Sequence, residues 1–385
     1  MGSPRVAVFV DMLSAYGREV LIGINRYTRT HGPWVIYGDP ERIVAPISEV
    51  GKWGGDGVIA HVYQPRMRRQ LQRMGLPVVN VSQYLGESVF PSVLPDNAAV
   101  GRLAAEHLLE RGFRHFAYCG FRRHRYGELR GEAFARRVIE AGYASERFDT
   151  DPPQERPEQW EARQAELAAW VGSLPRPVGV FCCNDARARH VAQVCHRAGV
   201  RVPEELALVG ADDDELVCEM SNPPLSSVDV SAEQVGYEAA ALLGRMMAGA
   251  SAPSPDSPML LAPAGVVTRR SSDVLAIDDA AVVASMRFIR DHASEPINVE
   301  DVLGVAHVSR RVLERRFRAM LGRTVGQEIA NVRLDRAKGL LIDSDLPAPD
   351  VAERCGYTYV QQFNAMFKRR TGMTPTAWRR QFRVR

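Results

Sequence analysis

The sequence of 385 residues has no long hydrophobic run, only six scattered cysteines and almost no lysine. The first apolar run, Val6 to Val10, is too short for a secretion signal, and no later stretch approaches the roughly 18 uncharged apolar residues of a membrane helix. We therefore expect a cytoplasmic protein without a membrane segment. The cysteines show no C-x-x-C spacing, and P-loop, G-x-S-x-G and H-E-x-x-H motifs are absent. We predict no disulfide framework, no metal and no cofactor.

The charges that are present are unevenly distributed along the chain. Hydrophobic residues make up 45% and charged residues 25% of the sequence, which is typical of folded globular proteins, and the length favours more than one domain. Residues 282–385 contain 19 basic and 11 acidic residues, whereas the preceding part contains 30 basic and 35 acidic residues. A basic terminal module on a mildly acidic body is typical of proteins that bind the phosphate backbone of nucleic acids.

The body alternates short β-branched runs with amphipathic segments, which predicts parallel strands joined by crossover helices. We expect an α/β, doubly wound fold with two lobes, because the body is too long for one such sheet, and a ligand cleft between the lobes. The predicted domains are a body over 1–270, a linker over 271–281 and a terminal module over 282–385. The predicted strands are Arg5–Val10, Trp34–Tyr37, Gly57–Ala60, Val78–Val81, His115–Cys119, Val178–Cys182 and Leu206–Val209. The predicted helices are Ala15–Thr30, Ala98–Arg111, Leu129–Ala141, Glu158–Val171, Ala186–Ala198 and Ala232–Met247.

After the linker the sequence is helical throughout, with the spacing of helix-turn-helix units. A short helix over Val299–Val305 is followed by a tight turn and a second helix that ends near Leu321. Leu313 and Phe317 recur at helical spacing in this second helix and predict its buried face. Its outward residues would be Arg310, Arg311, Glu314, Arg315 and Arg318, and an arginine-rich face is what major-groove contacts require.

A second unit of the same kind follows. A long amphipathic helix over Thr324–Ile342 leads to a second recognition helix over Tyr359–Arg370, buried through Phe363 and Phe367. The connecting helix of about 19 residues spans about 28 Å, close to the 34 Å between successive turns of one DNA face. The two recognition helices of one chain are therefore spaced so that they can enter adjacent major grooves.

The last hundred residues carry the signature of a known family. The run Gly356-Tyr357-x5-Phe363-x3-Phe367-Lys368-x3-Gly372-x2-Pro375-x2-Trp378-Arg379 resembles the signature of AraC-type transcription regulators, with Arg333-Leu334-x2-Ala337-x2-Leu340-Leu341 upstream of it. By this resemblance, DNA contacts fall on Arg311, Glu314 and Arg315 in the first unit and on Gln361, Gln362 and Asn364 in the second. We add Arg310 and Lys368 to these predicted DNA-binding residues.

The body resembles a different family, the periplasmic-binding-protein-like sensors of lac-repressor-type regulators. The similar segments are Asp96-Asn97-x3-Gly101, Asn184-Asp185 and Val209-Gly210-Ala211-Asp212-Asp213. Combined with an AraC-type module, and with Trp53-x2-Asp56-Gly57-Val58-Ile59-Ala60, the whole chain resembles the bacterial xylose operon regulators. This resemblance implies a homodimeric activator of sugar-catabolism promoters that responds to D-xylose, with RNA polymerase as a further candidate partner. Another aldose, such as arabinose, stays open as the effector.

A sugar site needs fixed polar groups for each hydroxyl and an aromatic ring against the apolar face of the sugar. Asn184, Asp185 and Asp212 follow predicted strands and so lie at their carboxyl ends, while Arg130 matches the arginine that grips sugar hydroxyls in the sensor family. The predicted ligand-binding residues are Asp11, Tyr16, His61, Arg130, Asn184, Asp185 and Asp212.

Each of these residues also has a simpler structural interpretation. Asp185 and Asp212 could be helix N-caps, Arg130 a surface ion-pair residue, Tyr16 a packing aromatic and His61 a loop histidine. Consecutive acidic residues project in different directions, so the run Asp212–Glu215 does not indicate a metal site.

Two other classes of protein compete with a regulator. A transport-associated sugar receptor is disfavoured by the missing signal sequence and by the DNA-binding module. A DNA-tethered enzyme with a cysteine nucleophile, as some AraC-type proteins are, would use Cys182 or Cys183, but these fall on a predicted buried strand with no histidine nearby in sequence. We therefore expect a regulator and not an enzyme.

Overall fold

The computed structural model describes residues 3–37, 54–151, 157–277 and 279–382, so Trp53, Asp278 and the last three residues lie outside the described part. The chain forms two units. The α/β unit comprises Met1–His107 and Arg114–Asp273, and the helical unit comprises Leu108–Phe113 and Val274–Arg385. The division between Asp273 and Val274 falls inside the predicted linker. The assignment of 108–113 to the helical unit was not anticipated from the sequence.

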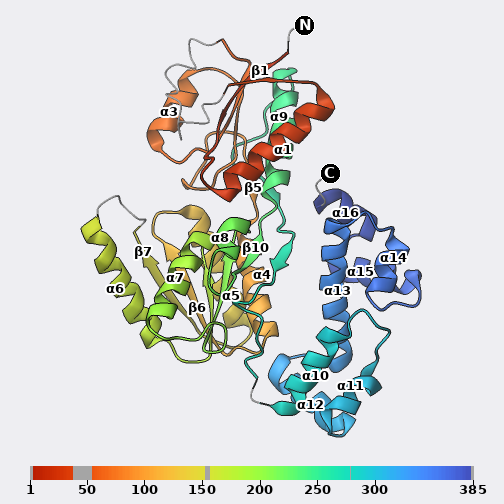
Figure 1. The fold of residues 1–385 in the computed structure, drawn as a ribbon. Coiled ribbons are helices and arrows are strands. Elements are labelled where there is room, and N and C mark those ends of the chain that lie inside the picture. Colours follow the sequence, from red (N-terminus) through yellow and green to blue (C-terminus); the bar gives the residue numbers. More distant parts are fainter. Residues whose placement is uncertain (1–2, 38–53, 152–156, 278, 383–385) are drawn as a thin grey trace. The chain divides into compact units, whose positions relative to one another are not determined.

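The first lobe of the α/β unit is built on a four-stranded parallel sheet in the order β2-β1-β3-β4 (Figure 1). Helices α1 (Ala15–His31) and α9 (Ala232–Met247) cover one face of this sheet, and α3 (Pro65–Arg73) covers the other. The strands are β1 (Arg5–Phe9), β2 (Val35–Tyr37), β3 (Gly57–Ala60) and β4 (Val78–Asn80).

Helices α1 and α9 come from distant parts of the sequence and pack with their backbones in contact. A Cβ atom built on Gly23 of α1 would lie 1.9 Å from the carbonyl oxygen of Glu233, and one on Gly236 of α9 would lie 1.9 Å from that of Val20. Only glycine permits this approach, so the two glycines fix how close the helices lie. The pairing shows that the chain returns to the first lobe after building much of the second.

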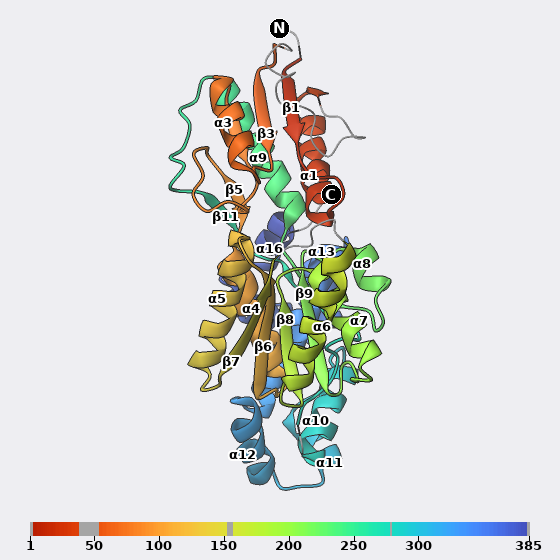
Figure 2. The same cartoon turned by 90° about the vertical axis from the view of Figure 1, so that its left-hand side faces the viewer.

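The second lobe is a six-stranded sheet in the order β12-β10-β9-β8-β6-β7, in which only β12 runs antiparallel to its neighbour. Figure 2 shows α4 and α5 on one side of this sheet and α6 and α7 on the other. The strands are β6 (His115–Phe121), β7 (Ser145–Thr150), β8 (Val178–Cys182), β9 (Leu206–Ala211), β10 (Ser226–Asp229) and β12 (Gly265–Val267). The helices are α4 (Asn97–Glu110), α5 (Arg125–Glu140), α6 (Pro157–Ser173), α7 (Asp185–Arg197) and α8 (Glu215–Glu219).

Connections between the lobes run through a small parallel sheet of β5 (Val93–Pro95) and β11 (Met259–Leu261). The four central strands of the second lobe, β6, β8, β9 and β10, are almost completely buried, with Leu206–Ala211 buried at every position. Continuous apolar strands are expected where helices cover both faces of a parallel sheet. The predicted doubly wound, two-lobed α/β fold is confirmed.

The helical unit contains two helix-turn-helix pairs joined by α13 (Val325–Asp343). Val282, Met286 and Ile289 of α10 pack with Leu313 and Phe317 of α12 in one core. Phe363 and Phe367 of α15 pack with Trp378 of α16 in a second core, with ring centroids 5.7 and 5.8 Å apart. The helices are α10 (Ala280–Asp291), α11 (Val299–Ala306), α12 (Arg310–Leu321), α14 (Ala348–Arg354), α15 (Val360–Thr371) and α16 (Pro375–Phe382).

The two predicted recognition helices are confirmed as α12 and α15, and the connecting helix as α13. The sequence predicted helical structure after the linker but not α10 as a separate helix, because its Ala- and Val-rich start follows the Ser- and Asp-rich linker without a strong break. Asp279 caps this helix by accepting hydrogen bonds from the backbone nitrogens of Ala281 and Val282. The predicted linker therefore ends inside the first helix of the helical unit.

Candidate sugar site and DNA-reading surface

The candidate ligand site lies where β6, β8 and β9 of the second lobe end. Arg130 lies on α5, which follows β6, Asn184 and Asp185 follow β8, and Asp212 follows β9. These strands are neighbours in the sheet, so their carboxyl ends bring the residues to one edge. The predicted placement of Asn184, Asp185 and Asp212 at strand ends is confirmed.

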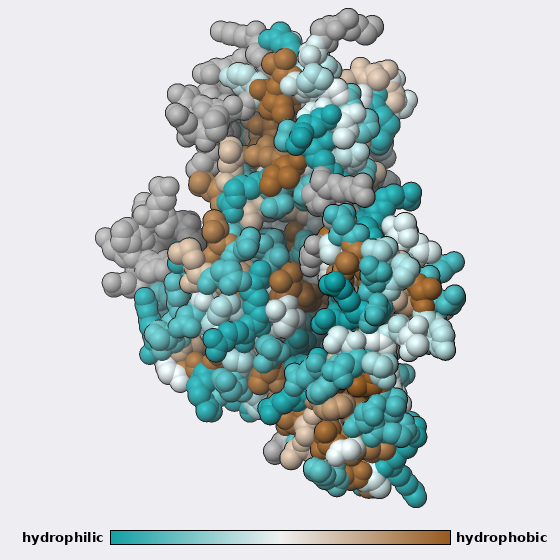
Figure 3. Space-filling model, turned by 45° about the vertical axis from the view of Figure 1, so that its right-hand side comes forward, coloured by the Kyte–Doolittle hydropathy of each residue, from teal (hydrophilic) through white to brown (hydrophobic). Residues whose placement is uncertain are grey.

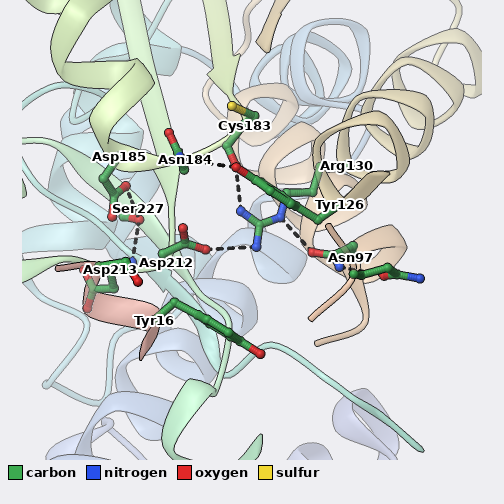
Figure 4. Close-up of polar contacts among 12 residues, drawn as sticks. Tyr16, Asn97, Tyr126, Arg130, Cys183, Asn184, Asp185, Asp212, Asp213 and Ser227 are labelled. Carbon is green, nitrogen blue, oxygen red and sulfur yellow. Dashed lines mark hydrogen bonds and ion pairs between the residues drawn. The ribbon is translucent and has the colours of Figure 1, made fainter. Parts of the chain in front are cut away.

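Arg130 is the centre of this group and is 3% exposed. Its Nε donates to Asn97 Oδ1 at 2.8 Å, its Nη1 to the Cys183 carbonyl at 2.6 Å and its Nη2 to Asp212 Oδ1 at 2.9 Å (Figure 4). Its guanidinium also lies 5.0 Å from the centre of the Tyr126 ring. The alternative interpretation as a surface ion-pair residue does not fit this burial. A buried guanidinium in which every nitrogen donates a hydrogen bond to the protein is held in one orientation.

The charges of this group depend on each other. Burial opposes the charged form of Arg130, but the Asp212 carboxylate together with Tyr126 and Cys183 more than offsets that effect and raises the pKa of the guanidinium above its usual value. Burial also raises the pKa of Asp212, and the pairing with Arg130 opposes this rise. The Asp212 side chain stays 20% exposed, whereas that of Arg130 is 3% exposed. Asp212 is therefore the member of the pair that a ligand can reach.

Asp185 has a different environment from Asp212. It is 2% exposed, its Oδ1 accepts from Ser227 Oγ at 2.6 Å, and its Oδ2 accepts from the Asp214 backbone nitrogen at 2.8 Å. Burial, together with the nearby Asp212, raises the pKa of Asp185 well above its usual range. Its carboxyl group therefore stabilises the loop after β9 through the hydrogen bond from the Asp214 nitrogen, and Figure 4 shows it beside Ser227. A ligand contact by Asp185 stays a prediction.

Asn184 caps α7, because its Oδ1 accepts from the Arg187 backbone nitrogen at 2.9 Å. Its Nδ2 donates to the Tyr126 hydroxyl at 3.4 Å. The helix cap considered for Asp185 is thus supplied by Asn184. Asp214, not Asp212, is the side chain that caps α8 by accepting from the Val217 backbone nitrogen.

Three predicted residues come from the first lobe. Tyr16 on α1 donates its hydroxyl to the Val81 carbonyl at 2.6 Å, and Figure 4 shows its ring beside Asp212. His61 follows β3 and lies edge-on to Tyr16, with ring centroids 6.0 Å apart. Asp11 follows β1, and its carboxylate accepts from the Leu13 backbone nitrogen at 2.9 Å.

His61 is the first-lobe residue that points most directly to a ligand. Its Nδ1 is buried and has no hydrogen-bond partner within the part of the chain that the structure describes. Burial lowers the pKa of His61 to about 4, with the Asp11 charge acting in the opposite direction, so the ring is neutral at pH 7. A neutral imidazole can donate or accept one hydrogen bond at each nitrogen, and a buried nitrogen without a partner is costly unless a ligand pairs with it.

Sequence reasoning missed several residues of this site. Asn97 accepts from Arg130 and donates through Nδ2 to Gln83 Oε1 at 2.9 Å. Tyr84 and His124 form a hydrogen-bonded pair at 2.5 Å, and Tyr126 lies against Arg130. Asn97 belongs to the motif Asp96-Asn97-x3-Gly101, which indicated only a family resemblance. Tyr84 lies in a loop and Tyr126 in the first turn of α5, and no periodic pattern in the sequence indicated that either ring would face the site.

The arrangement suits a small neutral polyhydroxylated molecule. It combines a carboxylate, a guanidinium, amides, a neutral imidazole and tyrosine rings, which together supply donors, acceptors and apolar faces. Among the described residues, no group of three or more His, Cys, Asp or Glu side chains is placed to hold a metal ion. The six cysteines are free and buried, and burial raises the pKa of Cys183 to about 12, which does not suit a nucleophile.

The helical unit presents the predicted DNA-reading residues. Arg310, Arg311 and Arg315 are exposed on α12, opposite the buried Leu313 and Phe317. Glu314 differs from the prediction of a largely outward side chain, because it is half-buried, 19% exposed, and lies 3.9 Å from Arg318. On α15 the predicted residues are all exposed, namely Gln361, Gln362, Asn364 and Lys368.

Family models match nearly the whole chain. A model described as the XylR N-terminal domain matches residues 5–98, a periplasmic binding protein-like domain matches residues 105–272, and a helix-turn-helix domain matches residues 303–381. No helix in the described ranges combines the length and apolarity needed to cross a membrane.

Individual relatives agree with these models. The xylose operon regulatory protein of Escherichia coli strain K12 is 34% identical over 383 residues, which cover 97% of this chain and 96% of that protein. The protein of the same name from Haemophilus influenzae is 31% identical, covering 97% of this chain and 98% of that protein. These relatives are named as operon regulatory proteins, in agreement with the predicted regulator.

Solved structures show the same architecture. A xylose-binding transcription activator is similar over 100% of both chains, with 32% identity and a TM-score of 0.64. A regulator in complex with cellobiose shares the fold over 70% of this chain and 84% of its own, with 22% identity and a TM-score of 0.55. A LacI-family regulator from Enterococcus faecium with bound ribose does so over 71% of this chain and 100% of its own, with 18% identity and a TM-score of 0.57.

Proposed function

This chain belongs to the family of xylose operon regulatory proteins, and from that premise we propose that D-xylose is its effector and binds beside Arg130 and Asp212. The observation that supports this most is the Arg130 guanidinium, which is 3% exposed and is held in place by hydrogen bonds to Asn97, Cys183 and Asp212. Such a preorganised group binds hydroxyls without first having to be ordered.

The proposed contacts follow from the chemistry of each side chain. The exposed part of Asp212 accepts hydrogen bonds from adjacent sugar hydroxyls, and the unpaired Nδ1 of His61 bonds to a hydroxyl from the first lobe. The Tyr16 ring lies against the apolar face of the sugar. Each hydrogen bond to a charged group contributes about 1.5–3 kcal/mol, so a few of them supply the several kcal/mol that a population shift needs.

A panel of sugars tests the proposed effector. Thermal unfolding of the purified protein is measured with D-xylose, L-arabinose, D-ribose and D-glucose, and binding is then quantified by calorimetry. D-xylose should bind most tightly and, at 100 times its Kd, stabilise the protein by about 2.7 kcal/mol. Selective stabilisation by L-arabinose would establish the alternative aldose. If no aldose in the panel changes the unfolding temperature, the proposed sugar site is wrong.

The second part of the proposal concerns DNA. The exposed arginines of α12 and the polar residues of α15 enter adjacent major grooves, and α13 sets their spacing. Binding of promoter duplexes should weaken steeply with salt, because arginines that neutralise phosphates release counterions. A salt-independent affinity would contradict this assignment.

We also propose a cytoplasmic homodimer that activates transcription, with RNA polymerase as a partner. Exposed hydrophobic side chains of the first lobe, including Ile22, Val35 and Ile36, support association. Figure 3 shows a hydrophobic strip over this lobe on an otherwise largely hydrophilic face. Light scattering with size-exclusion chromatography should give a mass near twice 42.7 kDa. A monomer at all concentrations tested, with and without D-xylose, would refute the dimer.

A further inference from the structure

Three consecutive aspartates after β9 each pair with an arginine from a different part of the α/β unit. Asp212 accepts from Arg130 on α5 at 2.9 Å. Asp213 accepts from Arg269 near the end of the unit at 2.7 Å. Asp214 lies 3.4 Å from Arg18 on α1 of the first lobe. Only the first of these pairs belongs to the proposed sugar site, so the other two need a separate explanation.

The backbone of this loop is held in an unusual conformation. Asp212 has a φ of 99° and Asp213 a φ of 48°, in the region that side-chain-bearing residues rarely adopt. The Asp213 nitrogen donates to Ser227 Oγ at 3.0 Å, and the Asp214 nitrogen donates to the buried Asp185 carboxyl at 2.8 Å. Strained backbone of this kind persists only where its surroundings hold it, and it recurs at ligand clamps and switches.

Arg269 connects the loop to the segment by which the chain leaves the α/β unit. Its Nη1 donates to Asp213 and to the Leu225 carbonyl at 3.1 Å, and its Nε donates to Glu219 at 2.8 Å. The Arg269 side chain is 14% exposed. The α/β unit ends at Asp273, so Arg269 belongs to its last residues.

The exit segment itself is firmly attached to the sheet. Ser271 is completely buried, its carbonyl accepts from the Leu208 nitrogen at 2.8 Å, and its Oγ donates to the Leu208 carbonyl at 2.7 Å. The Arg269 nitrogen donates to Ser226 Oγ at 2.8 Å. Through these contacts the exit segment is attached to β9 and β10, and β9 is the strand that leads into the loop carrying Asp213.

We propose that the Asp213–Arg269 ion pair links the sugar site to the exit segment, residues 269–273. Through this pair, ligand binding at Asp212 changes the position of that segment. This inference rests on the proposed sugar-responsive function. Because Asp212 and Asp213 share one peptide unit, a ligand that repositions Asp212 also changes the Asp213–Arg269 geometry. The ion pair between Asp214 and Arg18 of α1 links the same loop to the first lobe, so the loop also responds to the position of that lobe. Asp213 and Arg269 are positioning residues and do not contact the sugar.

The test compares two carboxylates that pair with the same arginine. Asp213→Asn removes the Arg269–Asp213 ion pair next to the proposed sugar site. Glu219→Gln removes the Arg269–Glu219 ion pair, in which the Glu219 side chain is 56% exposed. Calorimetry gives the D-xylose Kd of each variant, and fluorescence anisotropy gives its promoter-fragment Kd with and without saturating D-xylose. The ratio of the two DNA constants is the coupling factor, which a purely structural role would leave unchanged.

In Asp213→Asn we expect the D-xylose Kd to stay within about threefold of the wild type, while the coupling factor falls from at least about fivefold to less than about twofold. Glu219→Gln should keep the wild-type factor. Arg269→Lys, which keeps a charge but loses the planar fork, should lie between them and replaces Asp213→Asn if that variant does not fold.

Two results would overturn the inference. One is an unchanged coupling factor in Asp213→Asn or Arg269→Lys. The other is a loss of D-xylose binding in either variant as severe as that in Arg130→Ala, which would place the pair in the ligand grip. The proposed function is judged separately on the wild type alone, because its failure appears there as no sugar binding or no sugar effect on DNA affinity.

Discussion

At the scale of single residues, the proposed ligand site depends on a few side chains with fixed neighbours. Arg130 has three hydrogen-bonding partners, and each of them uses a different nitrogen. The strand-end positions of Asn184, Asp185 and Asp212 could be predicted, because a run of β-branched residues marks where each strand ends. The direction of each side chain could not. Nothing in the sequence distinguishes Asp212, which is partly exposed, from Asp185, whose two oxygens support a loop.

Arg130→Lys should abolish high-affinity sugar binding. Lysine keeps the charge but cannot hold Asn97, Cys183 and Asp212 at once, so Asp212 loses its fixed orientation and the sugar loses the donors of the planar guanidinium. The loss of two charge-assisted hydrogen bonds to the sugar, at about 1.5–3 kcal/mol each, should lower D-xylose affinity by at least about 100-fold in calorimetry. Arg176→Lys, in the surface pair with Glu205, is the matched control and should bind normally. Equal affinity in the two variants would contradict the assigned role of Arg130.

Buried neutral histidines should make stability depend on pH. Burial lowers the pKa of His61 and of His124 to about 4, against about 6.5 in the unfolded chain. Their contribution is complete above pH 6.5 and is lost as the pH falls toward 4, because the unfolded state binds more protons in that window. At pH 5 the loss is at most about 2 kcal/mol per histidine.

Urea unfolding at pH 7.5 and pH 5.0 measures this effect when the wild type is compared with the His61→Gln, His124→Gln double variant. The comparison cancels the contribution of carboxyl groups such as Asp185. The double variant should lose less stability on acidification than the wild type. An identical loss in both proteins would show that the two imidazoles are not buried in the neutral form.

At the scale of elements, the sequence pattern predicted the helices and strands better than their partners. The 3.6-residue period of Leu313 and Phe317 was sufficient to predict α12 and its buried face. By contrast, the pairing of α1 with α9 joins segments some 200 residues apart, and no local period encodes such a contact. The position of Asn97 beside Arg130 was missed for the same reason, because the two residues lie on different helices.

Gly236→Ala should separate α1 from α9. The added methyl group would lie 1.9 Å from the Val20 carbonyl oxygen, so the helices must shift, which costs about 1–3 kcal/mol. Gly172→Ala near the end of α6 is the control, because a methyl group added there would meet no side chain or other element of the described chain within 4 Å, and alanine should slightly favour the helix. Chemical denaturation of both variants checks the prediction, and equal stabilities would show that the helices are not in backbone contact.

Arg315→Ala on α12 should weaken DNA binding without affecting the fold. Its exposed side chain is predicted to neutralise one phosphate, so the slope of log affinity against log salt should decrease by about one. Arg122→Ala, which removes an exposed arginine of the α/β unit, is the matched control and should keep the wild-type slope. Anisotropy titrations between about 50 and 300 mM salt give both slopes. If the Arg315→Ala slope equals that of the wild type, Arg315 contacts no phosphate.

At the scale of the whole molecule, charge and hydrophobic period predicted an α/β body and a basic helical module, and the family resemblance implied a sensor joined to a DNA-binding module. The matched family models confirm that organisation. The division of the chain at Asp273 falls inside the predicted linker, whereas the assignment of Leu108–Phe113 to the helical unit could not be predicted. That short segment is the last turn of α4 and the residues just after it, and its sequence contains no sign of a different partner. The chain thus combines a periplasmic-binding-protein-like α/β unit with two helix-turn-helix pairs.

The most direct measurement is the affinity of the full-length protein for a promoter fragment, titrated by anisotropy at about 150 mM salt with and without saturating D-xylose. We expect D-xylose to tighten binding by at least about fivefold in the wild type and to have no effect in Arg130→Lys. An equal affinity with and without sugar in the wild type, or an unchanged sugar effect in Arg130→Lys, would contradict this expectation.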